Sequence, residues 1–224
     1  MLYNSNISKH YSNILKTDSK ETLYIMKQIT FKQYRTIDIL ILVALTIIFE
    51  AIATLATAKW FALQPVAISI GLAMICIVMM RWGWQAAFAA FVSGFVFCAL
   101  SKATAQQYII YCVGNIFALL GMVWFKVFGK EGIRKSMWLI TLFVSTAYVG
   151  QVLGRSILAI IFGDNISTLV TFATTDIMSL VFAVLVIILF RKTDGMLEDQ
   201  KTYLLRLDKQ KKETENEPVT EVEF

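Results

Sequence analysis

Apolar residues in this chain collect into six long runs, which are separated by short segments containing charges, glycine or proline. The runs cover Thr36–Ala58, Ala62–Met80, Gly83–Leu100, Ala105–Phe128, Ser136–Phe162 and Ile166–Phe190. A helix needs about 20 apolar residues to cross the hydrocarbon core of a bilayer. The pattern therefore predicts an all-α, polytopic membrane protein whose membrane domain is a bundle of six transmembrane helices.

Polar segments flank the predicted bundle. We expect three regions, an N-terminal tail, the membrane domain and a C-terminal tail, at residues 1–35, 36–190 and 191–224. In the C-terminal tail, Leu197–Leu207 predicts a short interfacial helix with Leu197, Leu204 and Leu207 on its lipid side. The charge-rich remainder predicts disorder. The first 25 residues lack the apolar core of a signal peptide. Met26 is an alternative start, so we expect residues 1–25 to be dispensable.

The charges outside the runs predict the orientation. Both tails, Arg81 and the loop region Lys126–Lys135 carry all but three of the chain's 21 lysine and arginine residues; the exceptions are Lys59, Lys102 and Arg155. Positive charge marks the cytoplasmic face of a membrane protein. We therefore expect both termini in the cytoplasm and the protein in the cell membrane. The formal net charge of +5 follows this topology and does not indicate nucleic-acid binding.

Ionisable side chains well inside the runs are few: Glu50, Arg155 and Asp176. A charge at bilayer depth costs about 2.5–3.5 kcal/mol on insertion scales, so such residues usually face a bundle interior or a polar cavity. Helical spacing places further polar side chains on the same faces. The charged and amide residues lie from mid-membrane outward, and the inner halves of the runs are apolar. We predict an outward-opening solute site formed by Glu50, Thr54, Tyr111, Asn115, Gln151, Arg155 and Asp176.

The three charges also have a purely structural interpretation. Arg155 could pair with Glu50 or with Asp176 and hold the helices together. The three formal charges sum to −1, so a single pairing leaves one carboxylate uncompensated. That carboxylate must then be protonated, satisfied by neutral donors, or available to a ligand.

Several kinds of chemistry are not expected. No P-loop, HExxH or GxSxG motif occurs, and the single histidine, His10, lies in the tail. Cys76, Cys98 and Cys112 lie within apolar runs without CxxC spacing, which predicts buried free thiols. We therefore expect no catalysis, no metal and no cofactor, and any energy source must be an ion gradient or a partner chain.

Small residues at four-residue spacing predict close helix contacts. Ala86, Ala90 and Gly94 form two consecutive steps in the third run, and Gly150 and Gly154 form a GxxxG step in the fifth. Such faces let helix backbones approach one another, either within the bundle or toward a partner. Packing within the bundle is the default interpretation.

Three stretches carry a family resemblance: TIDILILVALTIIFEAIATL, MMRWGWQAAFAAFVSGFVFCALSKATAQQYIIYCVGNIFALL and TTDIMSLVFAVLVIILFRKTDGMLEDQKTYLLRL. They are similar to the substrate-binding S components of energy-coupling-factor (ECF) transporters, over about residues 32–207. The resemblance implies a membrane subunit that binds a vitamin or related small micronutrient from outside. It implies docking onto a transmembrane coupling protein and two cytosolic ATPases, which alone hydrolyse ATP.

The docking feature of that family, an AxxxA pattern in the first span, is not present in its strict form. Its nearest matches are Ala53-x-x-x-Thr57 and Thr54-x-x-x-Ala58. The candidate docking residues are therefore Ala53, Thr57, Ala58, Ala86, Ala90 and Gly94.

Two other functions stay open. One is a stand-alone secondary transporter that uses protons through Glu50 or Asp176, for which internal repeats and interrupted helices are typical. We see no repeat between the two halves and no pair of spans interrupted by glycine or proline. The other is a scaffold protein that transports nothing and uses its polar residues only for packing.

Overall fold

The computed structural model of the 224-residue chain describes residues 31–60, 68–193, 195–206 and 209. The chain divides into two compact units, Met1–Leu40 and Ile41–Phe224. The described part of the first unit is the beginning of helix α2 (Phe31–Trp60), where the Thr36 hydroxyl donates to the carbonyl of Lys32 at 3.0 Å. The remainder of α2 and the other described elements belong to the second unit.

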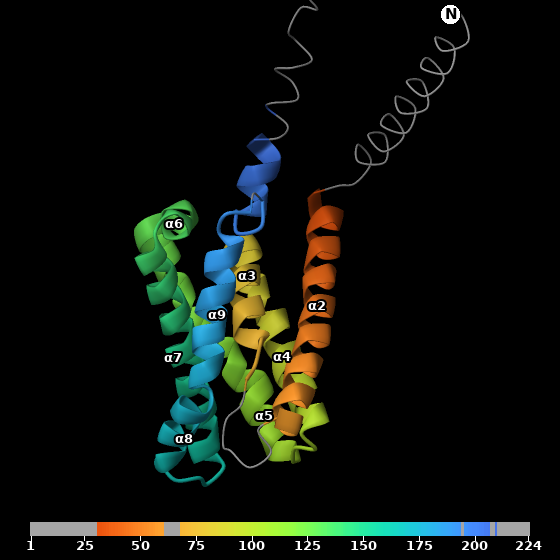
Figure 1. Cartoon of the computed structure of the whole chain (residues 1–224), viewed down its shortest axis with the longest axis vertical. Helices are drawn as coiled ribbons and strands as arrows, with labels where there is room; N and C mark the ends of the chain where they lie inside the picture. Colours follow the sequence, from red (N-terminus) through yellow and green to blue (C-terminus); the bar gives the residue numbers. More distant parts are fainter. Residues whose placement is uncertain (1–30, 61–67, 194, 207–208, 210–224) are drawn as a thin grey trace, which may run out of the picture. The chain divides into compact units, whose positions relative to one another are not determined.

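Every described element of the second unit is helical (Figure 1). After α2 these elements are α3 (Gly71–Trp82), the 3-10 helix η1 (Gly83–Gln85), α4 (Ala86–Leu100), α5 (Ala105–Gly114), the 3-10 helix η2 (Asn115–Met122), α6 (Val123–Lys135), α7 (Met137–Ile161), α8 (Ser167–Thr175) and α9 (Ile177–Phe190). Residues 200–206 are also helical.

Length and hydropathy identify four helical stretches as candidate membrane spans, Phe31–Trp60, Gly71–Leu100, Ala105–Lys135 and Met137–Ile161. Helices α8 and α9 are bent by 43° relative to each other and form a fifth candidate if they are taken as one broken span. The prediction of an all-α, polytopic membrane protein is confirmed at this level.

The stretch from Gly71 to Leu100 reverses its direction at Gly83, whose φ of 67° lies in the left-handed region that favours glycine. A Cβ atom on Gly71 would lie 1.9 Å from the hydroxyl oxygen of Ser93. A straight helix would hold these two residues about 33 Å apart. Helices α3 and α4 therefore pack side by side in opposite directions.

The reversal makes α3 a short helix. Its 12 residues are about 18 Å long at 1.5 Å per residue, little more than half the hydrocarbon core. The predicted second run, Ala62–Met80, is wrong in its first part, because residues 68–70 are not helical and the helix begins at Gly71. Residues 61–67 of that run lie outside the described residues.

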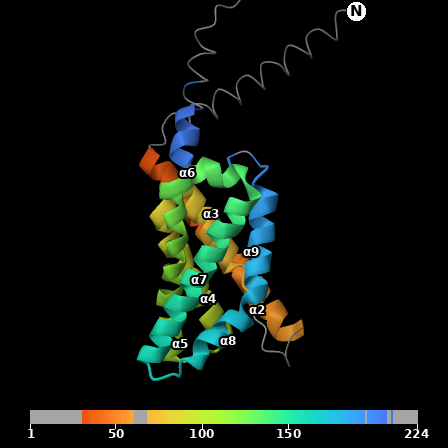
Figure 2. The ribbon, with the colours of Figure 1, turned by 90° about the vertical axis from the view of Figure 1, so that its left-hand side faces the viewer.

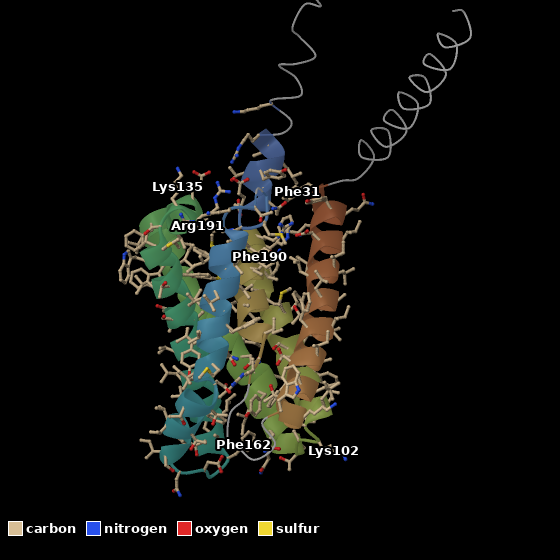
Figure 3. The ribbon with its side chains drawn as sticks, in the orientation of Figure 1. Phe31, Lys102, Lys135, Phe162, Phe190 and Arg191 are labelled. Atoms are coloured by element: carbon tan, nitrogen blue, oxygen red, sulfur yellow. The ribbon has the colours of Figure 1, made fainter. Side chains whose placement is uncertain are left out.

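Different helices and loops lie at the two ends of the second unit. Figure 3 places Lys135 and Arg191 at one end and Lys102 and Phe162 at the other. Helix α6 lies at the first of these ends and α8 at the second (Figure 2). The predicted break between the fourth and fifth runs is a kink within α6, at Gly129 with a φ of 67°.

The segment after α9 packs against α6 through ion pairs. Lys130 Nζ lies 2.5 Å from Asp199 Oδ1, and Arg134 Nη1 lies 2.6 Å from Glu198 Oε1. Leu197 is 1% exposed, so the prediction that it faces lipid is wrong. Leu204 is half-buried, and Leu207 lies outside the described residues. The Leu197 side chain is covered by protein because the ion pairs hold this segment on the end of the helices.

Close helix packing uses the small residues that the sequence singled out. Ala86 and Ala90 have no exposed surface, and a Cβ on Gly94 would lie 2.6 Å from the backbone oxygen of Tyr111. This stripe of α4 therefore packs against α5 and η2 inside the bundle. All three residues are covered by neighbouring helices, in agreement with the default interpretation of packing within the bundle.

Candidate functional site

Helix α2 buries a polar stripe and exposes its apolar residues. Ile52 and Leu55 are each 58% exposed, and the buried residues are Leu42, Thr46, Glu50, Ala53 and Thr54. A helix between lipid and a polar interior needs this inverted pattern, because ionisable groups in a membrane turn away from lipid.

Glu50 is the most buried charge of the site, at 1% exposure. Its Oε2 accepts a hydrogen bond from the backbone N–H of Gly71 at 2.7 Å and one from the hydroxyl of Ser69 at 2.9 Å. Gly71 is the first residue of α3, so the carboxylate lies at the positive end of that helix dipole. Its other oxygen, Oε1, has no hydrogen-bond partner within the described residues.

Asn115, the first residue of η2, connects three elements of the site and is 1% exposed. Its Oδ1 accepts hydrogen bonds from Arg155 Nε at 2.7 Å and from Gln151 Nε2 at 2.9 Å, both on α7. Its Nδ2 donates to the carbonyl of Ala90 on α4 at 3.4 Å. The amide therefore fixes the direction in which the Arg155 side chain points.

Arg155 pairs with Asp176 and not with Glu50. Its Nη1 forms the ion pair with Asp176 Oδ2, and the two side chains are 5% and 13% exposed. The guanidinium also lies over the ring of Tyr111, 4.6 Å from the ring centroid, which is a cation–π contact. Asp176 stands between α8 and α9, so the ion pair joins α7 to the break in the last predicted span.

Two helices begin beside this cluster. Helix α3 begins at Gly71 and α9 at Ile177, and the backbone N–H of Ser69 donates to the hydroxyl of Ser179 at 2.9 Å. Helix N-termini carry unsatisfied N–H groups and a partial positive charge. Both carboxylates of the site thus lie at the start of a short helix, where the N-terminal N–H groups favour negative charge.

A small cavity lies at the centre of the cluster, with a volume of about 10 Å³. That is about the space that a single water molecule needs. Arg155 is six residues from the Ile161 end of α7, about 9 Å, so the cavity lies nearer the end that carries Lys102 and Phe162. The lining residues are Glu50, Ser69, Ser93, Phe97, Tyr111, Asn115, Arg155 and Asp176.

A larger cavity of about 400 Å³ lies at the other end, between α6 and the segment that follows α9. Its basic residues Lys130, Arg134 and Arg206 form ion pairs with acidic residues of the same lining. The cavity is larger but its charges already have partners. We therefore place the candidate solute site at the smaller, more deeply buried cluster.

The structure brings most of the predicted binding residues together. Two of them lie outside the cavity lining: Gln151 reaches the site only through Asn115, and Thr54 lies one turn beyond Glu50 on α2. The Thr54 hydroxyl is buried and has no hydrogen-bond partner within the described residues. The other predicted residues, Glu50, Tyr111, Asn115, Arg155 and Asp176, line the cavity.

Sequence reasoning missed Ser69, Ser93 and Phe97. The signal for Ser69 was Gly71 two residues later, a glycine inside an apolar run that marks the actual start of the helix. Ser93 directly precedes Gly94 of the small-residue stripe, and a polar side chain on such a closely packed helix could have been predicted to face the site. Phe97 looks like any lipid-facing residue in the sequence, so no sequence signal marked it as part of the site.

The last predicted run, Ile166–Phe190, contains a break. Helices α8 and α9 break at Asp176, and the break contains neither glycine nor proline. The helix is interrupted instead at Asp176, whose backbone has φ −95° and ψ 5° and whose side chain pairs with Arg155. Among the described residues, no group of three or more His, Cys, Asp and Glu side chains could hold a metal ion.

Comparisons with protein-family models, with curated proteins and with solved structures find no match for this chain. The function is therefore argued from the geometry and the charges of the site.

Proposed function

We propose that this chain is the substrate-binding S component of an ECF-type importer. It is then a six-pass protein of the cell membrane with both termini in the cytoplasm, the passes being α2, α3, α4, α5 to α6, α7 and α8 to α9. It captures a vitamin or related small micronutrient from outside, and a transmembrane coupling protein with two cytosolic ATPases delivers it to the inside. The supporting observation is the buried, mixed-charge cavity nearer the predicted outer end.

Apolar packing between the cavity and the predicted cytoplasmic end supports a binding subunit over a channel. Leu72, Ile75 and Met79 of α3 and Ile187 of α9 are each at most 1% exposed. A conducting path needs polar or hydrated surface along its whole length. A site that is closed on one side needs a further protein to release its solute to that side.

Admission of a solute requires the cavity to widen, and α8 is the element best suited to move. Within the described structure no residue of α8 is buried, so its displacement exposes little apolar surface. Phe172 of α8 packs edge-on against Tyr111 at 5.9 Å between ring centroids. Rotation about Asp176 at one end and Gly163, with a φ of 101°, at the other would open the cavity wall.

Docking of the coupling protein is assigned to the end of α2. Of the small residues predicted there, Ala53 is buried, Thr57 is half-buried and Ala58 is exposed. Thr57 and Ala58 are therefore the two that a partner can reach.

A stand-alone secondary transporter is the second candidate. The half-length helix α3 and the broken pair α8 and α9 favour it, because ion-coupled transporters bind solute at such interruptions. In that case Glu50 or Asp176 would carry the coupling proton. If the protein transports nothing, the ion pair of Arg155 serves packing alone.

The test begins with the tagged full-length chain purified gently from its host, and asks which proteins accompany it. We expect an integral coupling protein and two ATPases. Vesicles that contain the complete complex should then take up the solute only with ATP inside, and a complex with an inactive ATPase is the control. Uptake by the purified chain alone under a proton gradient would instead establish the secondary transporter. A chain that brings no ATPase and transports nothing would leave only the scaffold.

A further inference from the structure

We propose that the solute carries a protonated amine or amidine group and that Glu50 binds it. This inference rests on the proposed function, since it assigns the chemical class of the solute that the same site receives. It assigns different roles to the two carboxylates. Asp176 is the partner of Arg155, and Glu50 is the partner of the solute.

Charge is the first reason. Glu50, Arg155 and Asp176 carry a formal sum of −1, and Arg155 is paired with Asp176. Within the described residues, the hydrogen-bond donors to the remaining carboxylate are both neutral, the N–H of Gly71 and the hydroxyl of Ser69. A buried charge without a counter-charge is costly. A cationic solute would bring the site to neutrality, whereas an anion would double its excess charge.

Free hydrogen-bonding capacity at Glu50 is the second reason. Both donors approach Oε2, and Oε1 has no hydrogen-bond partner within the described residues. The side chain is 99% buried and Glu50 lines the cavity. An ionised carboxylate only accepts hydrogen bonds, so the group that completes it must be a donor.

A second acceptor stands beside that carboxylate. The point where a Cβ on Gly71 would lie is 1.9 Å from the hydroxyl oxygen of Ser93 and 3.1 Å from Glu50 Oε2, so the two side chains are neighbours. The Ser93 hydroxyl has no hydrogen-bond partner within the described residues. One N–H to Glu50 and a second to Ser93 match an amidine or an aminoheterocycle with adjacent donors. Phe97 and Tyr111 also line the cavity and pack against each other, with ring centroids 4.8 Å apart, so this wall of the cavity is aromatic.

Arg155 offers little to an anionic solute. Its Nε donates to Asn115, its Nη1 is engaged by Asp176, and its face covers Tyr111. An anion at the remaining Nη2 donors would add negative charge beside Asp176 and Glu50, and Arg155 is the one cation among the described residues that line the cavity. We therefore assign Arg155, Asn115 and Asp176 to positioning the aromatic wall and the break before α9.

The test uses three probes of one shape and three charges: benzamidinium, benzamide and benzoate. Their binding to the purified full-length chain in detergent is measured by ligand-observed NMR, with the thermal unfolding shift as a second readout. We expect wild-type protein to bind benzamidinium at least about tenfold more tightly than benzoate or benzamide, the usual scale of a charge-assisted hydrogen bond.

Two variants locate the preference. Glu50→Gln keeps an acceptor oxygen for Gly71 and removes the charge, and should weaken benzamidinium binding about tenfold or more. The matched control Glu131→Gln makes the same change at a 60% exposed side chain far from the cavity and should bind like wild type. If Glu50→Gln does not fold, Ser93→Ala, which leaves both donors to Glu50 in place, should weaken benzamidinium by a smaller factor.

Equal or tighter binding of benzoate would overturn the assignment and leave a solute-binding subunit with an anionic substrate. Absence of benzamidinium binding to the wild-type chain would also overturn it. The proposed function is then decided separately by whether ATPases accompany the chain from its host.

Discussion

The substitution Gly94→Ala probes the contact that brings the two cavity-lining helices α4 and α5 together. The new Cβ would lie 2.6 Å from the backbone oxygen of Tyr111 and 2.7 Å from its carbonyl carbon. Ordinary contacts begin at 3.4 Å, and backbone atoms cannot turn aside as a side chain can. The helices must therefore separate by about 0.8 Å, and overpacking of this kind typically costs about 1–3 kcal/mol.

Alanine also forms helix more readily than glycine, by about 1 kcal/mol, so a matched substitution is needed. Gly132→Ala supplies it, because its Cβ would meet only the Phe128 side chain at an ordinary 3.7 Å. We expect Gly94→Ala to be less stable than Gly132→Ala by about 1–3 kcal/mol, because the propensity gain is shared and the overpacking is not.

The assay is the free energy of unfolding in mixed detergent micelles, obtained by titration with a denaturing detergent and followed by tryptophan fluorescence. Gly94→Ala should also weaken solute binding, since α4 carries Ser93 and Phe97 and α5 carries Tyr111. Equal stability of the two alanine variants would refute the close approach of α4 and α5.

Further predictions concern the buried polar groups. Asn115→Ala leaves two buried donors without their acceptor and should lower the free energy of unfolding by about 2–4 kcal/mol. The control Thr141→Ala removes an exposed hydroxyl bonded to its own helix and should change that free energy by less than about 0.5 kcal/mol. Equal effects of the two substitutions would contradict the hydrogen-bond network around Asn115. Glu198→Ala removes the buried partner of Arg134 and should lower the free energy of unfolding by about 1–3 kcal/mol. Glu131→Ala removes a carboxylate from exposed ion pairs and should lower it by at most about 0.5 kcal/mol. The reverse order of the two effects would contradict the packing of the C-terminal segment. The three buried cysteines should react with a maleimide only after denaturation, as mass spectrometry would show, and labelling of the folded protein would contradict their burial.

The periodicity of polar and apolar residues predicted the helical class and most of the candidate binding residues, because both depend on patterns within single helices. A polar stripe such as Thr46, Glu50 and Thr54 on an otherwise apolar helix has one face that can turn away from lipid. The sequence could not decide which carboxylate Arg155 would engage, since both Glu50 and Asp176 were within reach of a bundle interior. That choice depends on the break before α9, which places Asp176 beside α7.

The errors share a physical cause: hydropathy does not report backbone direction. Residues 68–70 belong to an apolar run in the sequence, yet the helix begins only at Gly71, where Glu50 accepts a hydrogen bond from the first N–H. The small-residue stripe of α4 could pack against a partner protein or against a neighbouring helix. The close approach of the Tyr111 backbone to Gly94 shows that it packs against α5. Both outcomes depend on contacts between residues distant in sequence.

The most direct test of the account is native mass spectrometry of the full-length chain purified gently from its host. We expect wild-type protein and Glu131→Gln to carry a bound vitamin-sized molecule with a cationic amine or amidine group, and folded Glu50→Gln to carry none. A wild-type protein that is consistently empty, with Glu50 variants that fail to fold, would contradict the account, because the buried charges would then serve only to hold the helices together.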